Sequence, residues 1–177
     1  IDPKGNNSKN GKYGIPAINP FASDNDDKTL GEVYARGFRN PNRVAWTPEG
    51  KMLVSDIGLN SIEELNLIQA GSDYGWPQRE GTFFLNNKGK MNKVYALQPD
   101  ESNFNFVYPI AQFDHDEGNA ISGGYVYEGN IGTLKNKYIF GDVATGRVFH
   151  IENEAIASGK PAEILEFDLL FKGVPST

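Results

Sequence analysis

The sequence predicts an all-β chain that forms part of a β-propeller. Its 20 glycines, 10 prolines and 12% aromatic residues favour many short strands joined by turns. Short apolar runs separated by turns also recur along the chain in two groups. Repeated units of roughly 40 to 50 residues with short antiparallel strands are typical of propeller blades. We therefore expect about two to three blades, each a four-stranded antiparallel sheet, connected by long loops.

Residues 1–30 are predicted to form a long loop region. The segment is rich in Asn, Gly, Ser, Lys and Asp, and Pro16 and Pro20 would interrupt a strand ladder. The first residues, from Ile1 to Gly5, do not resemble a signal peptide, and they do not begin with Met. We interpret residues 1–177 as a fragment of a single propeller domain, cut from a longer polypeptide.

Residues 31–77 are predicted to form the first blade. Two apolar runs, 44–46 and 51–56, flank a Pro/Gly turn at 47–50, which predicts a β-hairpin. A third apolar run at 64–68 follows closely. This segment therefore contains three strands in succession.

Residues 78–120 are predicted to be an excursion between blades, and residues 121–170 a second blade. The second blade contains four apolar runs separated by turns, at 123–127, 138–140, 147–151 and 163–167. This pattern predicts a four-stranded meander. Two blades cannot close a ring, because propellers typically need four to eight of them. We expect the remaining blades of the longer polypeptide to pack against the open faces.

The composition excludes several classes of function. The 17 Lys and Arg residues are outnumbered by 23 Asp and Glu, and the net charge of -6 argues against binding to nucleic acid or to anionic membranes. No apolar run approaches the ~20 residues of a membrane-spanning helix, so membrane insertion is not expected. The absence of Cys excludes disulfides and thiolate chemistry. A small or neutral partner fits better.

The most informative motifs lie in the first predicted blade. They read Gly37-Phe38-Arg39-Asn40-Pro41-Asn42-Arg43, Ser55-Asp56-Ile57-Gly58-Leu59-Asn60, Glu63-Glu64-Leu65-Asn66 and Gly71-Ser72-Asp73-Tyr74-Gly75-Trp76-Pro77. With Gly123-Gly124-Tyr125-Val126-Tyr127 further along, they resemble the glucose/sorbosone dehydrogenase family. Its members are six-bladed propellers that bind pyrroloquinoline quinone (PQQ) and calcium, and they include aldose sugar dehydrogenases. The resemblance spans most of the chain.

Arg39 and Asn40 have the clearest chemistry in these motifs. The guanidinium of Arg39 is a permanently charged planar fork, which suits a carboxylate or a quinone oxygen that gains negative charge on reduction. Asn40 adds a neutral donor and acceptor beside it. An isolated Arg-Asn-Pro run would more simply be an ion pair to a carboxylate followed by a turn. The resemblance implies instead that both residues contact PQQ.

Calcium prefers hard oxygen ligands, including backbone carbonyls in sharply bent loops. The resemblance implies that the carbonyls of Gly58 and Leu59 hold a calcium ion beside the cofactor. It also implies a second, structural calcium held by the side chain of Glu64 and the carbonyl of Tyr74. The alternative is that Glu63 and Glu64 form a solvated strand edge.

The resemblance also implies an activity for the parent protein. The parent protein would oxidise a sugar hydroxyl by hydride transfer to calcium-bound PQQ and then pass the electrons to an electron acceptor. It would act in the periplasm or outside the cell. The family's general base is a histidine on an earlier blade, so the base is expected upstream of Ile1. No catalytic residue is assigned in this chain, which alone should be inactive. The resemblance also implies a cofactor-binding lysine in the glucose-oxidising branch, where this chain has Val-Ala-Thr at 143–145, and this departure favours the aldose dehydrogenase branch or an uncharacterised branch.

Two other functions are open to the same fold. Related domains in hedgehog-interacting proteins keep the propeller and act as non-catalytic binding modules. A calcium-dependent lactonase is a second enzymatic alternative. Turnover of aldoses with PQQ and calcium would separate the dehydrogenase from both.

Overall fold

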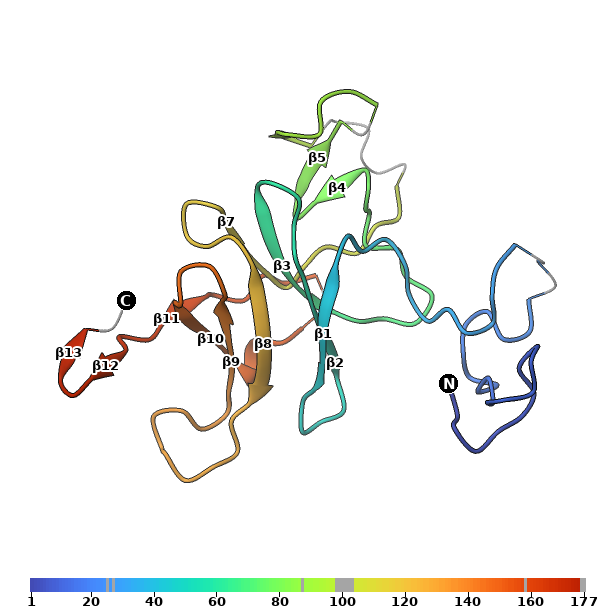
Figure 1. Cartoon of the computed structure of the whole chain (residues 1–177), viewed down its shortest axis with the longest axis horizontal. Coiled ribbons are helices and arrows are strands. Elements are labelled where there is room, and N and C mark those ends of the chain that lie inside the picture. The colour runs from blue at the N-terminus through green and yellow to red at the C-terminus, as the bar shows by residue number, and fades with distance from the viewer. Residues whose placement is uncertain (25, 27, 87, 98–103, 158, 176–177) are drawn as a thin grey trace.

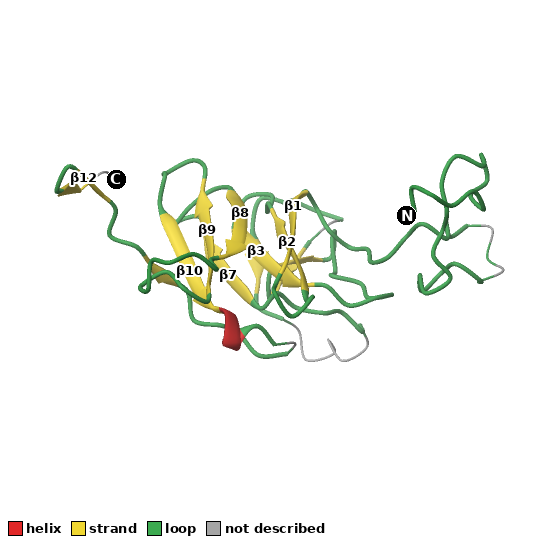
Figure 2. Cartoon of the chain, turned by 90° about the horizontal axis from the view of Figure 1, so that it is seen from below, coloured by secondary structure: helices red, strands yellow, loops and turns green. Residues whose placement is uncertain are grey.

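The computed structural model describes residues 1–177 except 25, 27, 87, 98–103, 158 and 176–177. The described residues form short antiparallel strands (Figure 1) and a single-turn 3-10 helix, η2 (Asn153–Ala155), which is red in Figure 2. The predicted all-β class is confirmed. No described residues form a helix with the length and apolar character needed to cross a bilayer.

The first sheet has the order β1-β2-β3-β7. Its strands are β1 (Pro41–Trp46), β2 (Met52–Asp56), β3 (Ile62–Leu67) and β7 (Ala111–Asp114). The turn between β1 and β2 is closed by a hydrogen bond from the Gly50 N–H to the Thr47 carbonyl (2.9 Å). Gly50 has a φ of +81°, a conformation that glycine adopts without the steric cost of a Cβ. The predicted hairpin is confirmed.

The segment between β3 and β7 carries a small sheet of its own. Its strands are β4 (Arg79–Glu80), β5 (Phe83–Leu85) and β6 (Val94–Tyr95), in the order β4-β5-β6. β7 then pairs with β3, so this segment is inserted before the last strand of the first sheet. Part of the segment predicted as an excursion, 98–103, lies outside the described residues.

The second sheet has the order β11-β10-β9-β8. Its strands are β8 (Ile121–Val126), β9 (Lys137–Asp142), β10 (Val148–Glu152) and β11 (Leu165–Glu166). They follow one another in the chain as neighbours, which confirms the predicted four-stranded meander. A final hairpin of β12 (Leu170–Phe171) and β13 (Val174–Pro175) projects at the opposite end of the molecule from the N-terminal segment (Figure 2).

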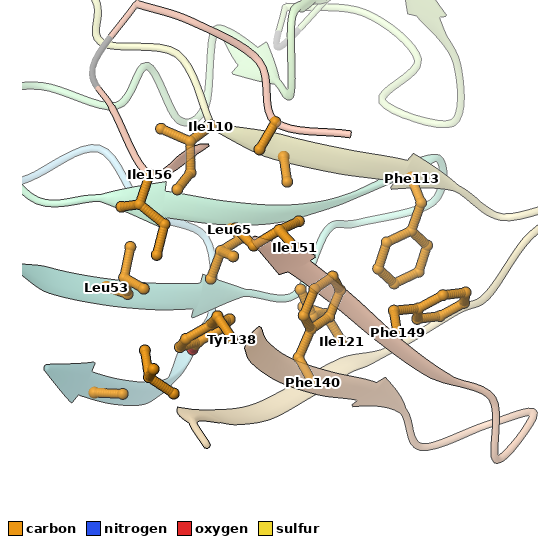
Figure 3. Close-up of a cluster of buried hydrophobic side chains, with 14 residues drawn as sticks. Leu53, Leu65, Ile110, Phe113, Ile121, Tyr138, Phe140, Phe149, Ile151 and Ile156 are labelled. Atoms are coloured by element: carbon orange, nitrogen blue, oxygen red, sulfur yellow. The ribbon is translucent and has the colours of Figure 1, made fainter. Parts of the chain in front are cut away.

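One hydrophobic core joins the two sheets. Side chains of Leu53 and Leu65 from the first sheet meet those of Tyr138 and Ile151 from the second, and all four are at most 1% exposed (Figure 3). Burying each such side chain stabilises the fold by roughly 1.5–3 kcal/mol. Polar contacts link the same sheets, because the Asn42 amide donates to the Ile121 carbonyl (3.0 Å). The first strands of both sheets, β1 and β8, therefore lie side by side.

The end of the second strand in the first sheet is fixed by a carboxylate. Asp56, the last residue of β2, accepts hydrogen bonds from the backbone N–H groups of Arg39 (3.0 Å) and Asn40 (2.6 Å). The next residue, Ile57, donates its N–H to the Asn40 carbonyl (3.1 Å). Asp56 thereby fixes the chain just before β1.

The second sheet repeats this arrangement with different residues. Asp142, the last residue of β9, accepts the backbone N–H groups of Asn119 (2.7 Å) and Ala120, just before β8. Val143 donates its N–H to the Ala120 carbonyl (2.9 Å), as Ile57 does to Asn40. Two sequences with little in common therefore build the same unit, as expected of repeated blades.

Candidate functional site

Arg39 and Asn40 lie on the loop that leads into β1. Gly37 starts this loop with a φ of +83°, and a Cβ added there would lie 2.2 Å from the Asp73 carboxylate. Only glycine allows so close an approach, so Gly37 sets the course of the chain towards Arg39. Asp56 then fixes the backbone of both predicted cofactor residues.

The guanidinium of Arg39 binds backbone carbonyls. Its Nη1 donates to the carbonyl of Gly58 at 2.6 Å and to that of Ile57 at 3.2 Å. The contact of Arg39 with the Asp56 carboxylate is made by its backbone N–H, whereas its side chain turns to the 57–58 carbonyls. The structure thus brings together two residues that the sequence analysis assigned to the cofactor, Arg39 and Gly58. The carbonyl edge of this loop already accepts a cation.

Gly58 is buried where three parts of the chain meet. A Cβ added there would lie 1.8 Å from the Ile62 carbonyl oxygen and 2.8 Å from Glu80 Oε1. Because real Cβ atoms do not approach backbone atoms so closely, any other residue would displace the loop. Leu59 follows in a partly exposed position, and Asn60 is exposed.

Glu80 is a residue of this loop's environment that the sequence analysis missed. Its Oε1 accepts hydrogen bonds from four consecutive backbone N–H groups, those of residues 59 to 62, at 2.9, 3.0, 2.9 and 3.1 Å. Its side chain is 1% exposed, and its Oε2 is buried without a hydrogen-bond partner among the described residues. No sequence signal could have linked Glu80 to a loop about twenty positions earlier. The two segments are brought into contact only when the chain folds and β4 packs beside this loop.

Glu64 lies on the central strand β3 and is 8% exposed. Its Oε1 accepts the Gly81 N–H (2.5 Å), and its Oε2 accepts the Asn66 amide (2.9 Å). Burial raises the pKa of Glu64 to about 7, with further contributions from the charges of Asp56 and Glu80, although both hydrogen bonds oppose the shift.

Tyr74, the other predicted ligand of a structural calcium, is 4% exposed. Its hydroxyl donates to the Leu67 carbonyl (2.7 Å) and accepts the Gln69 N–H (2.9 Å), while its ring stacks on Phe38 at 4.6 Å. These contacts fix Tyr74 against the end of β3, and none of them involves Glu64.

Glu63, next to Glu64, points to the other side of β3 and is fully buried. Its Oε1 lies 2.9 Å from His115 Nε2, and its Oε2 accepts the Ile121 N–H (2.9 Å). The alternative that Glu63 and Glu64 form a solvated strand edge is therefore wrong. β3 lies between β2 and β7, so both of its edges are paired, and the burial of Glu63 and Glu64 shows that both of its faces are covered.

The general base stays a prediction, because it is expected upstream of Ile1 and so outside residues 1–177. Ile1 is 71% exposed and belongs to the N-terminal segment. Among the described residues of this segment, the only β-bridge pairs Asp2 with Gly14. This segment lies apart from the sheet formed by β1, β2, β3 and β7 (Figure 1).

Several buried carboxylates surround the loop of residues 57–62. Burial raises the pKa of Asp56 to about 6, and the charge of Glu63 adds to the rise, whereas the N–H groups of Arg39 and Asn40 lower it. This concentration of buried negative charge favours a nearby cation. Yet among the described residues no three acidic, His or Cys side chains surround a common metal position.

The donor set fits calcium held mainly by backbone carbonyls. The loop offers hard oxygen atoms at an edge that already binds a guanidinium, because the Gly58 carbonyl accepts the Arg39 Nη1 at 2.6 Å. These oxygens suit calcium and do not suit soft transition metals.

Comparison with known proteins identifies sequences and structures that are similar to this chain. The sequence profile described as Glucose / Sorbosone dehydrogenase matches residues 8–166. HIPL2 protein of Arabidopsis thaliana is 30% identical over 142 residues, which is 75% of this chain and 19% of that protein. Quinoprotein glucose dehydrogenase B of Acinetobacter calcoaceticus is 43% identical over 88 residues, which is 50% of this chain and 17% of that protein.

A solved structure shares the fold. The PQQ-bound form of an aldose sugar dehydrogenase from Streptomyces coelicolor superposes with a TM-score of 0.56 at 24% identity, covering 85% of this chain and 35% of that protein. The fold prediction, a partial β-propeller, is confirmed by this likeness together with the two four-stranded sheets. The chain spans about a fifth of the length of the two curated relatives.

Proposed function

The chain belongs to the glucose/sorbosone dehydrogenase family, and from this premise we propose that it forms part of a PQQ-dependent aldose dehydrogenase. This protein would oxidise a sugar hydroxyl by hydride transfer to a calcium-bound quinone. The observation that carries the proposal is the contact of Arg39 with the Gly58 carbonyl, because it joins the residues expected to hold PQQ and calcium. The 43% identity to a quinoprotein glucose dehydrogenase supports the same chemistry.

Each residue of the site has a role in this proposal. PQQ, when bound, supplies the acceptor for the hydride of the sugar. Arg39 provides a fixed positive charge, which stabilises negative charge on a neighbouring oxygen in a dry pocket. Asn40, the residue next to Arg39, offers a neutral donor and acceptor for the same cofactor.

Two calcium positions are assigned to this chain. The carbonyls of Gly58 and Leu59 would hold the ion beside the cofactor, and Arg39 would release Gly58 to do so. Glu64 and the Tyr74 carbonyl would hold a structural ion. The raised pKa of Glu64 supports this second position, because a cation would offset the cost of burying its charge.

The proposal also covers the rest of the longer polypeptide, its partners and its location. The remaining blades of the longer polypeptide would supply the general base upstream of Ile1, since no residue of this chain is assigned that role. The partners would be a sugar substrate and an electron acceptor. The periplasm or the extracellular space is the proposed location.

A non-catalytic binding module is the second candidate function. The observation that favours it is the match to the HIPL2 and HIPL1 proteins of Arabidopsis thaliana, each covering 75% of this chain. Val143, Ala144 and Thr145 also stand where the glucose-oxidising branch is expected to have a cofactor-binding lysine. A binding module would keep the fold and the calcium without turnover.

Reconstitution separates the two candidates. The full-length polypeptide that carries this chain is incubated with calcium and PQQ, and dye reduction is followed with a panel of aldoses. We expect a bound quinone spectrum, aldose-dependent dye reduction, and a loss of at least about tenfold in PQQ affinity for Arg39→Gln, because a charged contact is removed. Arg36→Gln is the matched control, since Arg36 pairs with Asp73 on the surface. Absence of a quinone spectrum and of turnover would refute the dehydrogenase.

A further inference from the structure

The loop of residues 58–62 has two chemically different sides. On one side, four N–H groups converge on Glu80 Oε1. On the other side, the Gly58 carbonyl meets the guanidinium of Arg39 at 2.6 Å. One anion and one cation therefore face each other across a single turn of backbone.

The geometry of the peptide bond connects these two sides. In a trans peptide, the N–H and the C=O of the same plane point in opposite directions. The Gly58 carbonyl shares its plane with the Leu59 N–H, and the Leu59 carbonyl shares its plane with the Asn60 N–H. Because both N–H groups point at Glu80, both carbonyls point away from it. Those are the two carbonyls assigned to calcium.

The negative charge of Glu80 is well placed to enforce this orientation. The carboxylate is 1% exposed, so water does not compete for the four N–H groups. Hydrogen bonds to an ionised acceptor are roughly twice as strong as neutral ones. Consecutive N–H groups that converge on an anion form a nest, whose peptide dipoles present their negative ends on the far side.

We propose that Glu80 is a positioning residue for calcium: it anchors residues 59–62 from behind and so presents the carbonyls of Gly58 and Leu59 to the ion. This inference rests on the proposed function, because it deepens the calcium site assigned there. Glu80 contacts neither the sugar nor the cofactor in this role. Its effect passes through the four backbone N–H groups.

Calcium titration of the full-length polypeptide without PQQ tests the proposal. Glu80→Gln keeps the size of the side chain and removes its charge, and Glu80→Asp keeps the charge on a shorter stem. Loss of a group that orients metal ligands typically weakens metal binding by roughly 10–100-fold. We expect a loss of this size for Glu80→Gln at one calcium site and partial rescue by Glu80→Asp. Glu64→Gln, measured in parallel, identifies the other site.

Asp142→Asn is the matched control, because Asp142 is also buried and also binds consecutive backbone N–H groups, but in the other blade. It should lower stability and leave calcium affinity within about twofold of that of the unaltered protein, because Asp142 accepts the N–H groups of residues 119 and 120 and none of those of residues 59–62. Equal calcium affinities of Glu80→Gln and the unaltered protein would overturn the role of Glu80. No calcium binding by the unaltered protein would refute the calcium sites of the proposed function themselves.

A measurement on the unaltered protein keeps the test decisive if Glu80→Gln does not fold. Amide hydrogen exchange of residues 59–62 is followed with and without calcium. We expect slow exchange at these four amides and further slowing when calcium binds, because the ion and Glu80 hold opposite sides of the same peptides. Exchange as fast as in an exposed loop, or no response to calcium, would overturn the proposal.

Discussion

Buried carboxylates that bind backbone N–H groups shape the loops before β1 and β8 and the loop before β3. Asp56, Asp142 and Glu80 each bind two or more of these groups. Sequence motifs indicated Arg39, Asn40, Gly58 and Leu59 as functional residues, and the structure brings Arg39 into contact with Gly58. The sequence did not indicate Glu80, because nothing local distinguishes it from a solvated glutamate.

The pH dependence of folding stability tests whether the Asp142 carboxylate stabilises the fold by accepting backbone N–H groups. Burial alone would raise the pKa of Asp142, but hydrogen bonds from Ala120, Thr145 and Asn119 outweigh it and lower the pKa below the ordinary value of 3.8. A lowered pKa means that the ionised carboxylate stabilises the fold above the unfolded pKa, and that this stabilisation is lost as pH falls through the folded value. Asp142→Asn should therefore cost about 1–3 kcal/mol at neutral pH.

The measurement is thermal unfolding of both proteins from neutral pH down to about pH 2. The difference in stability between the unaltered protein and Asp142→Asn should shrink once the pH drops below 3.8. Asp116→Asn is the control, because Asp116 is an exposed residue of the loop after β7. A difference that stays constant to the acid end of the range would contradict the prediction.

At the scale of elements, local patterns predicted the strands well. The hairpin of β1 and β2 and the meander from β8 to β11 follow from apolar runs separated by Gly- and Pro-containing turns. The pairing of β7 with β3 did not follow from such a pattern, because a long segment with its own small sheet separates the two strands. Hydrogen-bonded pairing between strands that are distant in the chain depends on which sheet faces are buried in the complete fold.

Gly58 tests how tightly the loop between β2 and β3 is packed. Gly58→Ala places a Cβ against the Ile62 carbonyl, so the loop must move or β3 must shift. We expect a loss of roughly 2–4 kcal/mol in unfolding free energy, within the range of overpacked or strained sites. Calcium affinity should fall with it.

Chemical denaturation and calcium titration measure the two effects. Gly132→Ala is a matched control, since a Cβ added at Gly132 meets no atom within 4 Å and its φ is not in the left-handed region. This variant should unfold within ~0.5 kcal/mol of the unaltered protein. A Gly58→Ala protein as stable as Gly132→Ala would show that the loop yields easily.

At the scale of the whole molecule, the two sheets share one core and should unfold together. The rings of Phe113 in β7 and Phe149 in β10 lie 5.3 Å apart across the boundary between the sheets, and both are 3% exposed (Figure 3). Edge-to-face and tilted aromatic pairs add to the stability that burial already provides. Neither sheet could bury these rings alone.

Phe113→Ala tests this coupling. Removal of a buried phenylalanine typically costs about 3–5 kcal/mol. The loss should accelerate amide exchange in both sheets, including β9 and β10, which do not contain the substitution. Val143→Ala is the control. Val143 is 70% exposed, so this substitution should leave stability and amide exchange unchanged. Faster exchange confined to the first sheet would contradict a shared core.

The sequence by itself determined the all-β class, the blade repeat, the family and the residues expected at the cofactor. These follow from short-range patterns and from motifs, which a chain carries without knowledge of its fold. Only the tertiary structure decided that Glu63, Glu64 and Glu80 are buried, that Glu80 holds the 59–62 loop, and that Arg39 binds the Gly58 carbonyl. The reason is physical: the burial and the partners of a charged side chain are set by segments far away in the chain.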